Sequence, residues 1–245
     1  MKLKENERID DLELNDLKII QNKNGFCFGM DSVLLSDFAK EIKKNSTILD
    51  MGAGTGILGI LLFAKTQDTK IIGVEIQPEV AQMAQRSVEL NHLEGRIDII
   101  CKDIKELNKV YEKQSFDAIV TNPPYKKKGT GGVNENEAKL ISRHEITANL
   151  EDFISMASYL LKDQGSIYMV HRPERLADII TSLRKYKLEP KVIKFVYPNQ
   201  EKEPNLILVK ASKNARSFLK IEKPIYIYDS QGNYTDEILK IYHKW

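Results

Sequence analysis

The five-residue turn Thr121–Tyr125, Thr-Asn-Pro-Pro-Tyr, carries the groups best suited to chemistry in this chain. It follows the apolar run 116–120, which is typical of a buried strand, and its two prolines end that strand because neither can donate a ladder hydrogen bond. In open α/β sheets, ligands bind at the carboxyl ends of strands. The Asn122 amide, two backbone carbonyls and the Tyr125 ring together can hold a planar amino group. A proline turn with a helix-capping Asn is the alternative interpretation.

A second motif, from Thr47 to Leu58, predicts a strand, a glycine turn and a helix. Glycines allow a sharp turn and a close approach of the backbone to a ligand. The order is G-x-G-x-G, with Ile57 in place of the last glycine of the dinucleotide-binding fingerprint. A phosphate loop is also excluded, because no Lys-Ser/Thr pair follows. Asp50 would repel a pyrophosphate and instead suits a cationic group such as an ammonium.

The strand predicted over 70–76 supplies the third group, Glu75. An acidic side chain at this place can accept hydrogen bonds from both hydroxyls of a ribose. The three motifs together describe a ligand with a ribose, an amino-acid head and no phosphate. The sequence therefore predicts S-adenosylmethionine as the cofactor.

With these motifs in this order, the chain resembles the class I S-adenosylmethionine-dependent methyltransferases. The Asn-Pro-Pro-Tyr form narrows the resemblance to enzymes that methylate planar amino nitrogens, in adenine of nucleic acid or glutamine of protein. The flanking segments Gly29–Leu35 and Ser142–Glu145 are similar to the bacterial tRNA1(Val) adenine-37 N6-methyltransferase family. That resemblance, which spans roughly residue 19 to the end, implies methyl transfer to an exocyclic adenine amino group beside the anticodon of a valine tRNA.

The resemblance also implies a set of site residues. It assigns Asp103, which otherwise is a simple turn residue, to a hydrogen bond with the cofactor adenine. Phe28 and Asp31 are weaker cofactor-site expectations, and a hydrophobic staple with an N-cap explains them equally well. The expected catalytic residues are Asn122, Pro123, Pro124 and Tyr125. The expected cofactor-binding residues are Asp50, Gly52, Ala53, Gly54, Thr55, Gly56, Glu75, Ile76, Asp103, Ile104 and Asn122. The expected substrate-binding residues are Tyr125, Lys126, Lys127, Lys128, Arg143 and His144.

Rival functions stay open at this level. A protein glutamine methyltransferase uses the same turn but usually carries a helical domain, and here only 46 residues precede Thr47. A DNA adenine methyltransferase needs a target-recognition region, for which the residues after Tyr125 are too few. An rRNA methyltransferase is a further alternative. A non-enzymatic RNA-binding module is disfavoured by the intact motif residues.

Alternating strand and helix patterns predict an α/β fold with helices on both faces of a mostly parallel sheet. The resemblance implies a Rossmann-like, seven-stranded methyltransferase sheet whose last strand is antiparallel. We expect one domain over 1–245: an N-terminal extension (1–45) over the cofactor site, a catalytic core (46–212), and a C-terminal strand, turn and helix (213–245). The extension should contain a hairpin over 16–27 and a helix over 31–42.

Charge and composition complete the prediction. The chain of 245 residues has a net charge of +2, but the stretch 184–223 is strongly basic, and Lys126–Lys128 directly follow the turn. A basic surface near the site favours a polyanion such as tRNA, although a solvated lysine face is the alternative. The loop 126–137 is either a lid or a simple connection. Two cysteines without metal-ligand spacing and no apolar run of membrane length indicate a cytoplasmic protein with no metal, no membrane contact and no evident obligate protein partner.

Overall fold

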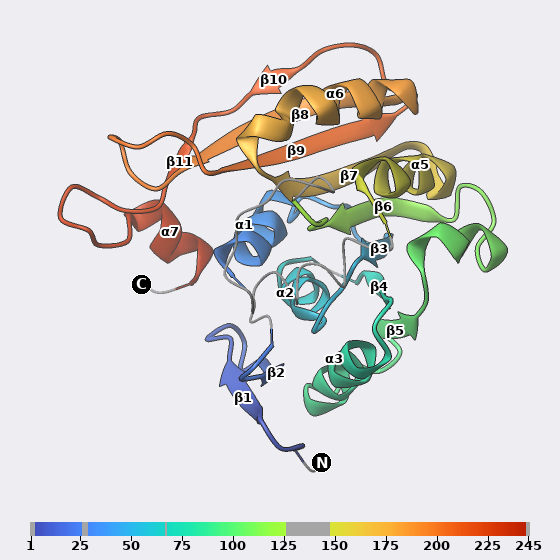
Figure 1. Ribbon diagram of the computed structural model, residues 1–245, viewed down its shortest axis with the longest axis vertical. Helices are drawn as coiled ribbons and strands as arrows, with labels where there is room; N and C mark the ends of the chain where they lie inside the picture. The colour runs from blue at the N-terminus through green and yellow to red at the C-terminus, as the bar shows by residue number, and fades with distance from the viewer. Residues whose placement is uncertain (1–2, 26–28, 67, 126–147, 244–245) are drawn as a thin grey trace.

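The computed structural model describes residues 3–25, 29–66, 68–125 and 148–243. A nine-stranded sheet runs through the molecule (Figure 1). Its strands are β3 (Thr47–Met51), β4 (Lys70–Glu75), β5 (Ile97–Cys101), β6 (Phe116–Thr121), β7 (Leu161–His171), β8 (Leu188–Tyr197), β9 (Leu206–Lys213), β10 (Lys220–Ile221) and β11 (Ile225–Tyr226). The helices are α1 (Met30–Phe38), α2 (Ile57–Lys65), α3 (Pro78–Leu90), α5 (Leu150–Leu160), α6 (Leu176–Lys185) and α7 (Asp236–Ile241), with 3-10 turns η1 (Ile104–Lys109) and η2 (Pro173–Arg175). No described helix is long and apolar enough to cross a bilayer.

The strand order is β10-β8-β9-β7-β6-β3-β4-β5, with β11 paired to β8. Strands β3 to β7 are mutually parallel, and the chain reverses its direction of travel across the sheet between β3 and β6. Such a switch point is where open α/β sheets bind ligands. β9 lies antiparallel between β7 and β8. The expected Rossmann-like sheet with an antiparallel last strand is therefore confirmed, and the short strands β10 and β11 extend it beyond seven.

Two apolar clusters cover the two faces of the sheet. Neighbouring residues of a strand point to opposite faces, so Ile48 of β3 packs with α1, α2 and α7, whereas Leu49 packs with α5 and α6. Figure 1 shows α1, α2 and α3 on one side of the sheet and α5 and α6 on the other. Because both faces are covered, the ends of the strands are the place where the sheet is open to a ligand.

The hairpin lies earlier than the sequence predicts. β1 (Glu7–Asp11) pairs antiparallel with β2 (Lys18–Asn22), so the prediction of a hairpin over 16–27 is wrong. Contacts with α3 explain the difference. Arg86 forms an ion pair with Glu7 at 2.5 Å, and Ser87 Oγ accepts a hydrogen bond from the Ile20 backbone at 3.0 Å.

Candidate active site

The predicted site residues meet at one edge of the sheet. Met51, the last residue of β3, is level with Val74 on one side and Thr121 on the other. The strand ends are level because the strands are parallel and in register. The ends of β3, β4 and β6 therefore lie at one edge of the sheet (Figure 1). This brings together the glycine turn after β3, Glu75 of β4 and the Asn-Pro-Pro-Tyr turn after β6.

The glycine turn is bound to Glu75. The Gly54 backbone N–H donates to Glu75 Oε2 at 3.0 Å, and the Gln77 N–H donates to Oε1 at 2.9 Å. Gly54 has a φ of +55°, and a Cβ placed on it would meet no atom within 4 Å. Its side of the turn is therefore open enough for a ligand to approach the backbone closely. Each Glu75 oxygen keeps a second lone pair with which it can accept a ribose hydroxyl.

Asp50 lies beneath the same turn with 1% of its surface exposed. Its Oδ2 atom has no hydrogen-bond partner among the described residues. Burial, and after it the charge of Glu75, raise the pKa of Asp50 to about 7, while the backbone of Gly59 lowers it. Two buried carboxylates side by side favour a ligand that brings positive charge. These acceptors around the turn thus fit the ammonium and the ribose hydroxyls of S-adenosylmethionine, which donate hydrogen bonds.

The pKa of Asp50 leads to a stability prediction. Its folded-state value of about 7 lies above the ordinary value of 3.8, so ionising it in the fold lowers stability as pH rises through that window. Without cofactor, Asp50→Asn should melt at a higher temperature than the wild type near pH 8, and the difference should shrink towards about pH 5. Thermal melts at both pH values check this. Equal melting temperatures of the two proteins at both pH values would contradict the pKa assignment. With saturating cofactor, the wild type should instead have the higher melting temperature.

Asp103 caps the 3-10 turn η1. Its Oδ1 accepts from the Lys105 backbone at 2.9 Å, and Lys105 Nζ lies 3.6 Å from Oδ2. The next residue, Ile104, is buried, and Ile76 after β4 is half-buried. Ile76 follows β4, which pairs with β3, and Ile104 comes after β5, which pairs with β4, so both lie at the same edge of the sheet as the glycine turn. Asp103 thus caps a turn, and its contact with the cofactor adenine stays a prediction.

The Asn-Pro-Pro-Tyr turn is held by Asp31 of α1. Asn122 Nδ2 donates to Asp31 Oδ2 at 2.9 Å, and the Tyr125 hydroxyl lies 3.0 Å from the same oxygen and 2.7 Å from Asn122 Oδ1. The N-cap of α1 is Gly29, not Asp31. Asp31 therefore orients the Asn122 amide: Nδ2 faces the carboxylate, and Oδ1 is left as the acceptor.

The Tyr125 ring packs inward in this arrangement. It lies 5.1 Å from the His171 ring and 5.2 Å from the Arg172 guanidinium, and Arg175 Nη1 lies 3.4 Å from the Tyr125 carbonyl. Burial, followed by the charge of Asp31, raises the pKa of Tyr125 above its ordinary value, so the hydroxyl keeps its proton. Burial and then Arg175 lower the pKa of His171 to about 4, which keeps its ring neutral. The rings of Tyr125 and His171 are therefore both uncharged, and the guanidinium groups of Arg172 and Arg175 lie beside Tyr125.

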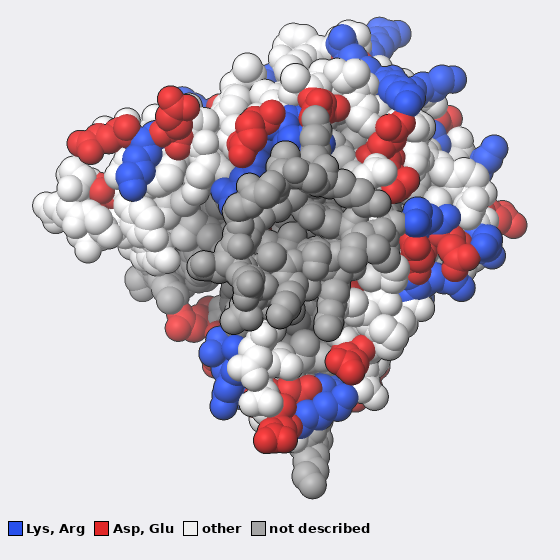
Figure 2. All heavy atoms as spheres, in the orientation of Figure 1, with Lys and Arg blue, Asp and Glu red and all other residues white. Residues whose placement is uncertain are grey.

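The surface charge is mixed. Within the basic stretch 184–223, Arg184 pairs with Glu189 at 2.8 Å and Lys220 with Glu222 at 3.1 Å. Figure 2 shows lysines and arginines interspersed with aspartates and glutamates over the face in view. The fold distributes these basic residues over several elements, and acidic neighbours offset part of the charge counted along the sequence.

Comparison with known proteins decides the family. The family model described as methyltransferase small domain matches residues 29–186. A relative from Porphyromonas gingivalis, tRNA1(Val) (adenine(37)-N6)-methyltransferase, is 30% identical, covering 87% of this chain and 86% of its own. This chain belongs to the methyltransferase small domain family.

Further comparisons also match this chain to methyltransferases. A protein of the same name from Haemophilus influenzae is 28% identical over 91% of this chain and 92% of its own. An Agrobacterium tumefaciens structure described as a predicted O-methyltransferase has a TM-score of 0.72 at 22% identity, covering 88% of this chain and 96% of that one. Geranyl diphosphate C-methyltransferase from Streptomyces coelicolor has a TM-score of 0.57 at 12% identity, covering 75% and 78%. At these identities the two structures show the fold alone.

Several expected residues of the methyltransferase lie outside the described part of the chain. These are Phe28, Lys126, Lys127, Lys128, Arg143 and His144. Their roles stay predictions, as does the lid over 126–137. Within the described residues, no group of three or more histidine, cysteine or acidic side chains could hold a metal.

The residues that surround Tyr125 were not predicted from the sequence. His171 ends β7, the strand next to β6 in the sheet, and Arg172 and Arg175 follow it. Their position directly after a predicted strand was the available signal, because all parallel strands end at one edge. Asp31 was expected only weakly, and the structure places it in direct contact with the turn.

Proposed function

We propose that this methyltransferase transfers a methyl group from S-adenosylmethionine to the exocyclic amino group of an adenine in tRNA. The names of its relatives make adenine-37 of a valine tRNA the proposed target. The supporting observation is the orientation of Asn122, whose amide is fixed by Asp31 and Tyr125 at the same strand edge as Glu75. With a tRNA substrate, we propose that the activity is cytoplasmic.

In this proposal, the residues of the chain position the two reactants and accept hydrogen bonds from them. S-adenosylmethionine supplies an electrophilic methyl group when it is bound. Glu75 would hold the ribose, and Asp50 would balance the ammonium. Asn122 Oδ1 and the Pro123 carbonyl would each accept one N–H of the target amino group. Those bonds favour a pyramidal nitrogen and strengthen as positive charge develops on it, which stabilises the transition state more than the ground state.

The target adenine must approach Asn122 past Tyr125. The Tyr125 hydroxyl already contacts Asn122 Oδ1 at 2.7 Å, so one lone pair of that oxygen is used by the protein. The second lone pair can accept the target N–H. For the target base to stack on Tyr125, as the motif predicts, the Tyr125 ring must turn away from His171. Asp31 would keep the Asn122 amide in place during this movement.

Nucleoside analysis of tRNA tests the proposal in cells. Mass spectrometry of digested tRNA from cells with and without the protein should show loss of one methylated adenosine without it. An Asn122→Ala protein returned to those cells should restore the modification much less than the wild-type protein does. Loss of methylated glutamine in a protein, with tRNA unchanged, would instead favour the glutamine methyltransferase.

A further inference from the structure

Exposed apolar side chains gather at the outer edge of the sheet. Phe218 is 72% exposed, Leu219 41% and Ile221 65%, and Ile221 belongs to the short strand β10. β10 pairs with β8 and ends the strand order, and Figure 1 shows it at the edge of the sheet. Short edge strands that carry lysines normally keep such an edge free of partners. An exposed apolar group at this edge therefore indicates a surface that another molecule covers.

The backbone of the edge has hydrogen-bonding groups that face away from the sheet. The Glu222 N–H donates to the Ile193 carbonyl of β8 at 2.9 Å. Because neighbouring residues of a strand direct their backbone groups to opposite sides, Ile221 directs its N–H and carbonyl away from β8. By the same alternation, we expect Leu219 and Lys223 to face outward as well. No strand of the described residues pairs with this outer side.

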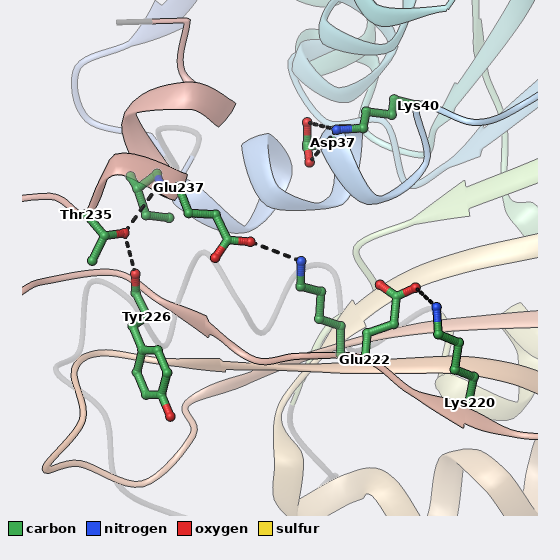
Figure 3. Close-up of polar contacts among 9 residues, drawn as sticks. Asp37, Lys40, Lys220, Glu222, Tyr226, Thr235 and Glu237 are labelled. Carbon is green, nitrogen blue, oxygen red and sulfur yellow. Dashed lines mark hydrogen bonds and ion pairs between the residues drawn. The ribbon is translucent and has the colours of Figure 1, made fainter. Parts of the chain in front are cut away.

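Charges at the edge select one way of pairing two such edges. Lys220 Nζ lies 3.1 Å from Glu222 Oε1 on one face of the strand (Figure 3). If two copies pair antiparallel about a twofold axis at Ile221, Lys220 of each copy lies opposite Glu222 of the other. An axis at Lys220 would place two lysines opposite each other, and an axis at Glu222 two glutamates. Like charges directly opposite are destabilising, so the axis at Ile221 is favoured, and it also pairs the outward backbone groups.

We propose that β10 binds β10 of a second copy of this chain, antiparallel and in register about Ile221. Such an interface uses one surface patch twice, as in the commonest class of homo-oligomer. It would pair the outward N–H and carbonyl of Ile221 and cover the exposed apolar side chains beside them. Because the paired edge is short, the dimer should be weak and should depend on protein concentration.

An exchange of charge between copies tests the partner. Sedimentation of the wild type should show a monomer–dimer equilibrium. Lys220→Glu or Glu222→Lys alone places like charges opposite each other, and should raise the dissociation constant of the dimer by about tenfold or more. A mixture of the two variants should dimerise again, because glutamates of one copy then face lysines of the other. The pair within each chain is broken in both variants, so this recovery can come only from contacts between chains.

Disulfide cross-linking tests the register. Opposite residues of a hydrogen-bonded antiparallel pair have Cα atoms about 5.5 Å apart, which lies within the range that a disulfide spans. Under mild oxidation, Ile221→Cys should therefore form a covalent dimer across the axis. Leu219→Cys is the matched control, because it changes an exposed residue of the same edge that faces Lys223 of the other copy, and it should form none. The wild type shows any cross-link through Cys101, which is exposed.

Three results would each overturn the proposal. These are a wild type that sediments as a monomer at every soluble concentration, a mixture of the charge variants that stays monomeric, and equal cross-linking of Ile221→Cys and Leu219→Cys. If the wild type is monomeric and Ile221→Glu weakens binding of an RNA hairpin, the edge contacts RNA instead. Thermal melts of the variants should match the wild type, because the substituted side chains lie at the surface.

The inference does not rest on the proposed function. Sedimentation and cross-linking measure association of the chain with itself and need neither cofactor nor RNA. A protein that methylates no tRNA but dimerises through β10 would contradict the proposed activity alone, whereas an active monomer would contradict the dimer alone.

Discussion

Asn122→Ala should lower the rate of methyl transfer by about 100- to 1000-fold, the usual cost of removing one preorganised polar partner of a transition state. Affinity for RNA should change far less, because phosphate contacts dominate binding. Single-turnover transfer with saturating cofactor and RNA measures the chemical step separately from binding. A rate close to that of the wild type would show that the turn is structural.

The contact between Asn122 and Asp31 gives this prediction a sharper control. From the sequence alone, Asn122→Asp should be mild, since a carboxylate also accepts the target N–H. In the fold, however, that carboxylate would replace an amide that donates to Asp31 at 2.9 Å, so two anions would face each other. We therefore expect Asn122→Asp to be impaired and the exchange Asp31→Asn with Asn122→Asp to recover activity. Absence of recovery would contradict the role given to Asp31.

Glu75→Ala should weaken cofactor binding by about 5- to 150-fold, because buried donors left unpaired cost about 1–3 kcal/mol. The substitution removes the acceptor of the Gly54 and Gln77 N–H groups as well as the proposed partner of the ribose. Isothermal calorimetry with S-adenosylhomocysteine measures the change.

Glu79 supplies the matched control for this change. It is an exposed glutamate in the first turn of α3, so Glu79→Ala should bind the cofactor as the wild type does. Thermal melts of both variants show whether Glu75→Ala also loosens the glycine turn. Wild-type affinity in Glu75→Ala would remove the cofactor assignment at this residue.

The core of the fold was predictable because its signals are local. Helix α2 (57–65) follows the glycine turn as predicted, and strand β4 (70–75) ends one residue before the predicted end at 76, since a glycine turn and an uninterrupted apolar run mark these elements. The parallel arrangement then brings Glu75, Asn122 and the glycine turn together, because each follows the carboxyl end of a strand. Local sequence and one rule of sheet topology were enough for these residues.

The remaining features depend on contacts between distant parts of the chain. β1 is polar and partly exposed, and its pairing depends on bonds between the hairpin and α3 that no local pattern reveals. Tyr125 was expected to offer its ring to a base, but His171 and Arg172, from another strand, pack against it.

Methyl transfer to a single adenine tests the central claim most directly. Purified protein would be incubated with S-adenosylmethionine and an unmodified valine tRNA transcript, and the digested RNA analysed by mass spectrometry. We expect N6-methyladenosine at adenine-37, and none in a transcript that carries another base there. Equal methylation of both transcripts, or none of either, would contradict the proposed activity.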